Sequence, residues 1–336
     1  MANHNRYTFR LAFLATCLAF IVVLLGADTR LHDAGISCPD WPGCYGHLGV
    51  PMSTDQIAQA NKLYPEMPVE PAKAWYEMIH RYFAGSLGIF ILAMAIIAIA
   101  RWRQTSQPRV VPLLLVALVI FQALLGMWTV TWKLLPGVVM GHLLGGMALL
   151  ALLWLLTLQS APSCCHKLNS SYEKLKPWAL IGLMIVCVQI ALGGWTSSNY
   201  AALICTGFPS CNGHLFPAMD FKTAFDIFSP IGINYFGGVL GTTARVTIQM
   251  THRYFALITA IYIGLLSLNL LFSKRTTGLR ILGLVILIIL GLQISWGILN
   301  VLWLLPRPIA VAHNGFAALL LLSLVTLNFC VSRQHK

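Results

Sequence analysis

The chain has 336 residues, of which 58% are hydrophobic and only 10% are charged. A water-soluble domain of this length could not bury so much apolar surface, so lipid is the expected solvent for most of the chain. The formal net charge of +12 does not indicate nucleic-acid binding, because the basic residues gather on one side of the apolar stretches.

Eight apolar stretches follow one another along the chain, each long enough for a helix to cross about 30 Å of hydrocarbon. The first stretch lacks the Ala-x-Ala cleavage site of a signal peptide and leads into seven more, so we interpret it as a retained helix. The sequence therefore predicts an all-α, polytopic membrane protein with eight transmembrane helices. These stretches lie near residues 10–29, 78–100, 110–131, 138–160, 178–198, 247–272, 280–303 and 309–331.

The last four stretches repeat the first four in order and spacing. His-Arg-Tyr-Phe-Ala occurs at 80–84 and again at 252–256, and C-PDWPG-C-YG in the first outer loop matches C-TGFPS-C-NG in the third. We therefore expect two tandem, pseudo-symmetric four-helix bundles related by an axis along the membrane normal. They are an N-terminal half (1–160) and a C-terminal half (178–336), joined by a cytoplasmic linker (161–177). A second repeated set keeps one constant offset: Gln122, Gly126, Trp132 and His142 match Gln293, Gly297, Trp303 and His313.

The charged residues predict the orientation in the membrane. Lys and Arg beside short loops mark the cytoplasmic face, and the acidic residues other than Glu173 fall on the opposite side or at its boundary. The sequence therefore predicts a multi-pass protein of the cell inner (plasma) membrane, with both termini cytoplasmic and the connections 31–76 and 199–246 outside. The basic residues on the side of the termini are Arg6, Arg10, Arg101, Arg103, Arg109, Lys167, Lys174, Lys176, Lys274, Arg275, Arg280, Arg333 and Lys336.

Two close cysteine pairs lie in the predicted outer loops, Cys38 with Cys44 and Cys205 with Cys211. Because that side of the membrane is oxidising, we expect each pair to form a local disulfide. Unpaired thiols are the alternative. A metal site is disfavoured, because the residues between the cysteines offer no second pair of ligands.

Four of the ten histidines lie near the outer ends of predicted membrane helices, at positions that are equivalent in the repeat. A single intramembrane histidine often only bonds a neighbouring helix. Four at matching depth predict haem binding instead, because neutral imidazole is a good axial ligand and paired histidines in a helical bundle suit a b-type haem. We expect His80 with His142 to hold one haem and His252 with His313 to hold a second. Glycines beside two of these histidines are expected to make room for the flat macrocycle: Gly141, Gly145, Gly146 and Gly315.

Arg81 and Arg253 each directly follow one of the histidines. A guanidinium at the outer membrane boundary can pair with a haem propionate. The alternative is that each arginine only extends its charged head towards the interface.

One acidic position breaks the repeat. Glu77 lies three residues before His80, whereas Gln249 lies three residues before His252. Residues three apart share a helix face, so Glu77 is expected to project towards the pocket of its histidine. A carboxyl group can transfer a proton or stabilise a cation, and an amide cannot. The N-terminal half is therefore predicted to be the reactive site, unless Glu77 is merely an interfacial acid.

With these features the sequence resembles the haem A synthase family of membrane enzymes. The resemblance covers nearly the whole chain: eight helices, duplicated halves, Glu-x-x-His, two copies of His-Arg-Tyr-Phe, and cysteine pairs in the first and third outer loops. It implies a haem-dependent oxidoreductase of haem biosynthesis and cytochrome oxidase assembly. The implied reaction oxidises the C8 methyl group of haem O to a formyl group, giving haem A for terminal oxidases.

The resemblance also implies roles for individual residues. Glu77 would be catalytic, His80 and His142 would bracket the substrate haem O, and the resident cofactor would be a haem b. His252 and His313 would be the axial ligands of that haem b.

For the loops, the resemblance implies that Cys38 and Cys44 are the family's functional pair. Not every member carries a second pair like Cys205 and Cys211. The implied partners are haem O, haem O synthase as a candidate, an electron donor or acceptor that the sequence does not identify, and the lipid bilayer. A homo-oligomer stays open, and nucleic acid is not expected.

Two other function classes would use the same histidines. A dihaem b-type membrane protein would pass electrons between two bis-histidine haems, and a haem transporter or chaperone would release haem unmodified. The enzyme is favoured because a pure electron carrier needs no acid at only one of its haems.

Overall fold

The computed structural model describes residues 2–101, 110–161, 174–272 and 276–332. Eight helices within these ranges are long and apolar enough to cross a membrane, which confirms the predicted all-α, multi-pass architecture. Two short helices, α2 (Thr54–Leu63) and α7 (Phe221–Ala224), lie in the long loops. The membrane helices are α1 (Ala2–Leu31), α3 (Pro71–Ala100), α4 (Val110–Thr131), α5 (Pro136–Ser160), α6 (Lys176–Ser198), α8 (Thr242–Phe272), α9 (Thr277–Leu302) and α10 (Arg307–Ser332).

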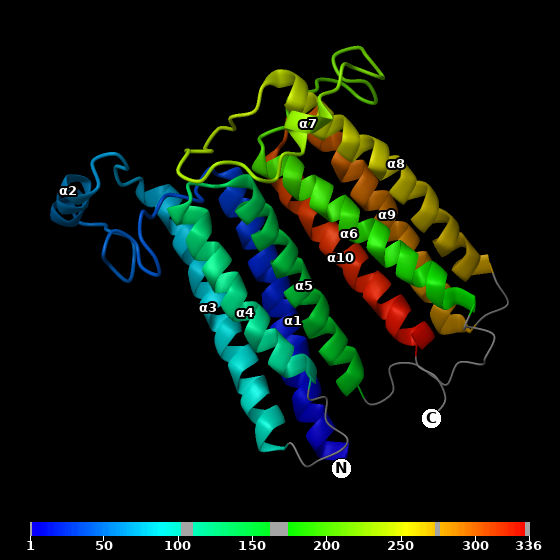
Figure 1. Ribbon diagram of the computed structural model, residues 1–336. Helices are drawn as coiled ribbons and strands as arrows, with labels where there is room; N and C mark the ends of the chain where they lie inside the picture. The colour runs from blue at the N-terminus through cyan, green and yellow to red at the C-terminus, as the bar shows by residue number, and fades with distance from the viewer. Residues whose placement is uncertain (1, 102–109, 162–173, 273–275, 333–336) are drawn as a thin grey trace.

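The membrane helices pack as two groups of four (Figure 1). In the first group α1 and α4 each contact both α3 and α5, and in the second α6 and α9 each contact both α8 and α10. The groups meet where α1 contacts α10, α5 contacts α6, and α5 contacts α10. Exchanging α1 with α6 and α5 with α10 maps these contacts onto one another, as the expected repeat requires. The predicted linker 161–177 falls largely outside the described residues.

Helices α5 and α10 form the middle of the molecule. Leu150, Leu153 and Leu156 of α5 are fully buried in the main apolar cluster, to which all eight membrane helices contribute. The indole nitrogen Nε1 of Trp154 donates a hydrogen bond of 2.8 Å to Oγ1 of Thr326 on α10. This bond satisfies two polar groups at a depth where an unpaired donor would be costly, and it joins the two groups of helices.

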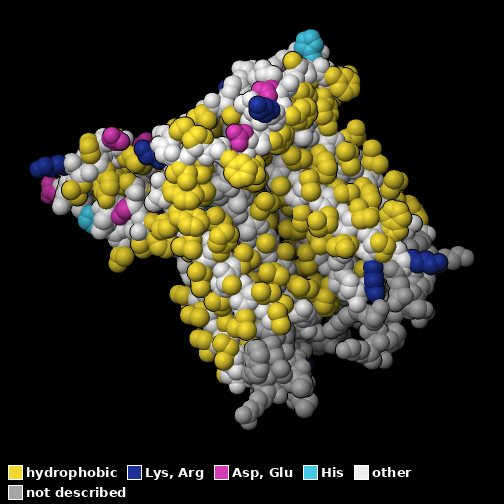
Figure 2. All heavy atoms as spheres, viewed as in Figure 1, with side chains coloured by type: hydrophobic (Ala, Val, Ile, Leu, Met, Phe, Trp, Pro, Cys, Tyr) yellow, Lys and Arg dark blue, Asp and Glu magenta, His cyan; other side chains and the backbone are white. Residues whose placement is uncertain are grey.

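Apolar side chains cover the sides of the bundle, and charged side chains lie at its ends (Figure 2). Large apolar residues such as Ile89 and Leu265 are more than half exposed, which lipid tolerates and water would not. Helix α1 begins, and α10 ends, at one end of the bundle, while the segments 32–70 and 199–241 lie at the other (Figure 1). On the visible face the acidic side chains gather at that loop end. Seven of the basic residues used to predict orientation lie outside the described residues: Arg103, Arg109, Lys167, Lys274, Arg275, Arg333 and Lys336.

A disulfide closes a small loop in each long connection, Cys38–Cys44 after α1 and Cys205–Cys211 after α6. This confirms the predicted local pairing. The two loops also share their anchoring to the following membrane helix. The hydroxyl of Tyr82 on α3 donates to the carbonyl of Leu48 at 2.7 Å, and the hydroxyl of Tyr254 on α8 donates to the carbonyl of Leu215 at 2.5 Å.

Part of the long loop before α8 crosses onto the first group of helices. Tyr235 is almost fully buried, and its backbone N–H donates to the carbonyl of Lys133 at 3.0 Å. Its side chain packs with Leu134 and Leu135, in the turn that leads into α5, and with Val138 in the first turn of that helix. The sequence predicted only an outer connection here, because irregular loop contacts leave no periodic pattern. The loop therefore ties the two groups together beside the helix that carries His142.

Candidate functional site

The four predicted haem ligands lie in the early turns of α3, α5, α8 and α10, at the end of the bundle that carries the long loops. His80 on α3 and His252 on α8 therefore lie at equivalent depths, and so do His142 on α5 and His313 on α10, as the repeat predicted. His80 and His142 belong to the first group of helices, and His252 and His313 belong to the second.

His80 and His142 face each other across the first group of helices. Their ring centroids are 6.4 Å apart, and the ring planes are nearly perpendicular, at 84°. Two imidazoles that bind one metal ion from opposite sides, with nitrogen–metal distances of about 2 Å, would have centroids roughly 6 Å apart. The observed separation therefore fits a pair of axial ligands on one iron.

Amide side chains hold the rings of the second pair. Nε2 of Gln189 lies 3.1 Å from Nδ1 of His252, and Nε2 of Gln293 lies 3.4 Å from Nε2 of His313. The backbone carbonyl of Gln293 lies 3.1 Å from Nδ1 of His313. A hydrogen bond at Nδ1 fixes the orientation of an imidazole that ligates through Nε2, whereas the amide of Gln293 lies at the His313 nitrogen that is left for iron. Gln189 was not predicted as a site residue, because its repeat-equivalent is Val22 and no motif contains it.

Unpaired polar atoms are numerous around the second pair. Asn314 follows His313 directly on α10. Trp296 and Asn300 lie on α9 close in sequence to Gly297, the glycine that lies against the His313 ring. A bound molecule with polar edges would give such atoms the partners that the described protein does not. The buried atoms without a partner among the described residues include Oε1 of Gln189, Gln249 and Gln293, Nε1 of Trp296, and Oδ1 of Asn300 and Asn314.

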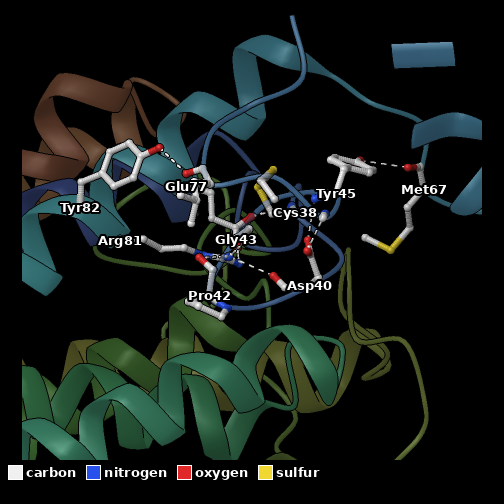
Figure 3. Close-up of a disulfide and its surroundings, with 12 residues drawn as sticks. Cys38, Asp40, Pro42, Gly43, Tyr45, Met67, Glu77, Arg81 and Tyr82 are labelled. Atoms are coloured by element: carbon white, nitrogen blue, oxygen red, sulfur yellow. Dashed lines mark hydrogen bonds and ion pairs between the residues drawn. A yellow bond between two sulfur atoms is a disulfide. The ribbon is translucent and has the colours of Figure 1, made fainter. Parts of the chain in front are cut away.

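Glu77 is nearly fully buried and is attached to the first disulfide loop (Figure 3). Its Oε2 accepts a hydrogen bond of 2.9 Å from the backbone N–H of Cys38, and its Oε1 accepts from the guanidinium of Arg81. These two donors compensate the carboxylate for the loss of water. Gln249, the equivalent residue on α8, is equally buried, but its Oε1 has no partner within the described ranges. The difference between Glu77 and Gln249 that the sequence predicted is therefore also a difference in contact: Glu77 binds the disulfide loop before its helix, and Oε1 of Gln249 has no such partner among the described residues.

Arg81 and Arg253 bind the disulfide loops. Nη1 of each donates to three loop carbonyls, so one side chain stabilises the backbone conformation between the two cysteines. Propionate pairing remains a prediction, for which the buried and unpartnered Nε of Arg253 offers a donor. The acceptors are equivalent in the two loops: Asp40, Pro42 and Gly43 for Arg81, and Gly207, Pro209 and Ser210 for Arg253.

Two of the four glycines expected to leave room for a macrocycle lie against protein side chains instead. A Cβ atom on Gly145 would overlap the amide of Gln122, and one on Gly315 would lie 2.9 Å from Leu24 of α1. At Gly141 and Gly146 a Cβ atom would make only ordinary contacts, at 3.9 Å and 4.0 Å, so their expected role stays a prediction. Sequence gave the proximity of the glycines to the histidines but not which neighbouring side chains lie against them.

Comparison with known proteins shows that one protein family covers all eight membrane helices. The family model COX15-CtaA, described as cytochrome oxidase assembly protein, matches residues 9–325. A heme A synthase of Shewanella oneidensis is 48% identical over 309 residues, which cover 92% of each chain. A heme A synthase of Caulobacter vibrioides is 27% identical over 344 residues, covering 92% of this chain and 91% of that protein. A third, of Alkalihalophilus pseudofirmus, is 26% identical and covers 66% of this chain and 67% of its own.

Proposed function

The chain belongs to the COX15-CtaA family of cytochrome oxidase assembly proteins, and on that premise we propose that it is a haem A synthase, an enzyme of haem biosynthesis. Its substrate would be haem O, and its reaction would oxidise the C8 methyl group to a formyl group. The observation that carries the proposal is the buried carboxylate of Glu77, one helical turn from His80. The other histidine pair has an amide in that place.

The two pairs of histidines would have different occupants. His80 and His142 would bracket haem O, and the 6.4 Å separation of their ring centroids supports this assignment. His252 and His313 would be the axial ligands of a resident haem b, whose iron supplies one-electron chemistry when bound. The amide of Gln189 and the backbone carbonyl of Gln293 support a permanent ligand, because each contacts Nδ1 of its histidine and orients the ring. Iron at Nε2 of His313 would displace the amide of Gln293 from that atom.

Glu77 would act on the methyl group that is oxidised. Loss of electrons and protons from that carbon leaves it electron-poor, and a carboxylate in a low-dielectric site stabilises such a centre or accepts its proton. Arg81 and the backbone N–H of Cys38 hold both carboxylate oxygens, so the group is oriented before the substrate arrives. Such preorganisation avoids the cost of reorienting the group during the reaction.

The placement in the cell follows from the same proposal. The protein would lie in the inner membrane with both termini in the cytoplasm, and its N-terminal half (1–160) and C-terminal half (178–336) would be separate haem-binding units. Both disulfide loops would then face the oxidising side, where disulfides persist. The enzyme that makes haem O would be a candidate partner.

The experiment is extraction of haems from membranes of a host that makes haem O and lacks its own haem A synthase. Membranes with this chain should yield haem A together with haem b, and membranes without it should yield no haem A. Recovery of haem b alone would indicate a dihaem electron carrier. Recovery of unmodified haem O bound to the purified protein, without haem A in the membranes, would indicate a transporter or chaperone.

A further inference from the structure

Each of the four histidine rings lies against a glycine on a neighbouring helix. A Cβ atom built on that glycine would have Cε1 of the imidazole as its nearest neighbour in every case. The four glycines are on α1, α4, α6 and α9, the membrane helices that carry no ligand. The Cβ-to-Cε1 distances are 3.0 Å for Gly26 with His80, 3.3 Å for Gly126 with His142, 3.2 Å for Gly193 with His252, and 3.0 Å for Gly297 with His313.

These distances are too short for ordinary carbon–carbon packing, which is optimal at about 3.5–4.0 Å. A glycine at each position therefore allows the imidazole edge to lie directly on the backbone of the adjacent helix. The arrangement is equivalent in the two halves, because Gly26 matches Gly193 and Gly126 matches Gly297 in the repeat.

Close helix packing is the usual reason for glycine in a membrane helix. That explanation does not account for these four positions, where the nearest group is the histidine ring and not the backbone of another helix. Gly283 is a useful contrast within α9. A Cβ atom there would lie 2.8 Å from the backbone carbonyl of Ser267, which is the contact expected of a packing glycine.

We propose that Gly26, Gly126, Gly193 and Gly297 are positioning residues that set the orientation of the axial imidazoles. The inference rests on the proposed function, because it requires the histidines to bind haem iron. A free imidazole can turn away from an added methyl group, since it is the far end of a side chain. An imidazole bound to iron cannot turn without rotating about, or lengthening, its bond to the metal.

An added methyl group should therefore perturb the haem more than the fold. Orientation and bond length of the axial ligands set the ligand field of a low-spin haem and its reduction potential. The C-terminal pair is the better place for a test, because haem b is the proposed permanent cofactor and is observed without turnover.

The experiment compares Gly297→Ala with Gly291→Ala in the purified holoenzyme. Both positions are on α9, but a Cβ atom on Gly291 would meet no atom within 4 Å. We expect Gly297→Ala to shift the low-spin ferric electron paramagnetic resonance signal and the midpoint potential of haem b, and to reduce the haem b bound per chain. Gly291→Ala should match the wild type in all three measurements.

Gly193→Ala provides a second variant, which acts on His252 from α6, and it should produce a shift of the same kind. The inference is overturned if both Gly297→Ala and Gly193→Ala are soluble, monodisperse and spectroscopically identical to the wild type. It is also overturned if Gly291→Ala shifts the signal as much as they do. A colourless but monodisperse Gly297→Ala protein supports it, because only ligation has then been lost.

His313→Ala separates failure of the inference from failure of the proposed function. If this variant keeps the wild-type haem b spectrum, His313 is not an axial ligand and the proposed function loses its cofactor assignment. If it loses that spectrum while the glycine variants keep theirs, the histidines bind haem and only the role of the glycines is wrong.

Discussion

The two groups of helices present the same scaffold with different side chains around the histidines. Both have a pair of histidines and a local disulfide in the loop before the first histidine helix. In both, an arginine donates to three carbonyls of that loop. Among the described residues, only the first group has a carboxylate, Glu77, that joins the histidine helix to the disulfide loop. In the second group the amide of Gln189 lies against a histidine ring. The comparison teaches that a duplicated fold can keep the same histidine scaffold in both halves, while a few substituted side chains make the two proposed haem sites different.

The largest effect is expected from removing the one negative charge that distinguishes the two sites. Glu77→Gln keeps the size of the side chain and makes the first site resemble the second. Because general acid–base catalysis typically contributes about 10²–10⁴-fold in rate, we expect formation of haem A to fall by that order. The measurement is the ratio of haem A to haem O in extracted membranes. Gln249→Glu is the matched control and should leave the ratio unchanged.

Wild-type haem A from a well-inserted Glu77→Gln protein would remove this residue from the mechanism. An equal loss from Gln249→Glu would show that both buried positions only tolerate their native side chain. Either result would remove the functional distinction between the two groups of helices.

The next effect compares the arginines. Arg81→Gln releases three loop carbonyls and one oxygen of Glu77, whereas Arg253→Gln has no acid to release. A hydrogen bond to a charged group contributes about 1.5–3 kcal/mol, so Arg81→Gln should lower haem A formation roughly 10- to 100-fold and Arg253→Gln much less. Both variants should expose their loop to added protease.

The same pair of variants tests the propionate prediction. If the arginines chiefly bind propionates, each variant should lose haem from its own site while its loop stays protected from protease. That outcome would contradict the role that the described contacts give to Arg81 and Arg253.

A smaller difference is expected between the disulfides. Replacing Cys38 and Cys44 together by serine should loosen the loop that donates to Glu77, whereas the same change at Cys205 and Cys211 leaves the acid untouched. A disulfide typically contributes about 2–4 kcal/mol, and loops this short lie at the lower end. We expect faster proteolysis of the affected loop in both double variants and a several-fold fall in haem A only in the first. Equal haem A formation by the two double variants would show that the Cys38–Cys44 loop does not contribute to the reaction.

The smallest effect concerns the pH dependence of the first loop. Burial, with added repulsion from nearby carboxylates, raises the pKa of Tyr45 to about 12, and the hydroxyl donates to the carbonyl of Met67 at 2.9 Å. An unfolded tyrosine titrates near pH 10, so the neutral form stabilises the loop fully below about pH 10, and this stabilisation is lost as the pH rises towards 12. The second loop has Asn212 in that place.

Absorbance of tyrosinate between about pH 9 and 12 measures this difference. Tyr45→Phe should remove one late-titrating tyrosine and should make loop proteolysis less dependent on pH above about 10. An unchanged titration curve would mean that Tyr45 is not the buried hydroxyl.

The sequence predicted the features that depend on composition and repetition. Apolar length revealed all eight membrane helices, but α3 and α8 begin several residues before the predicted 78 and 247. Their first turns contain polar residues such as Lys73 and Arg245, which end an apolar count although the helix continues. The repeat gave the histidine pairs and the asymmetry at Glu77, since both are visible as aligned residues.

The contacts between segments that are far apart in the chain could not be predicted in this way. The roles of Arg81 and Arg253 as loop anchors depend on where the loop backbone folds, which no residue type states. Tyr235 reaches the turn before α5 from a loop of the other group of helices. The glycines beside the histidines were partly visible, because Gly126 and Gly297 belong to a repeated motif, but their contact with an imidazole is a tertiary fact.

The most direct test of the division of tasks is haem content in the four single histidine-to-alanine variants. Changing His252 or His313 should deplete haem b, because one remaining axial ligand holds the iron weakly. Changing His80 or His142 should abolish haem A formation and leave most of the haem b bound. Equal loss of haem b from all four variants would contradict the account and would indicate a dihaem electron carrier.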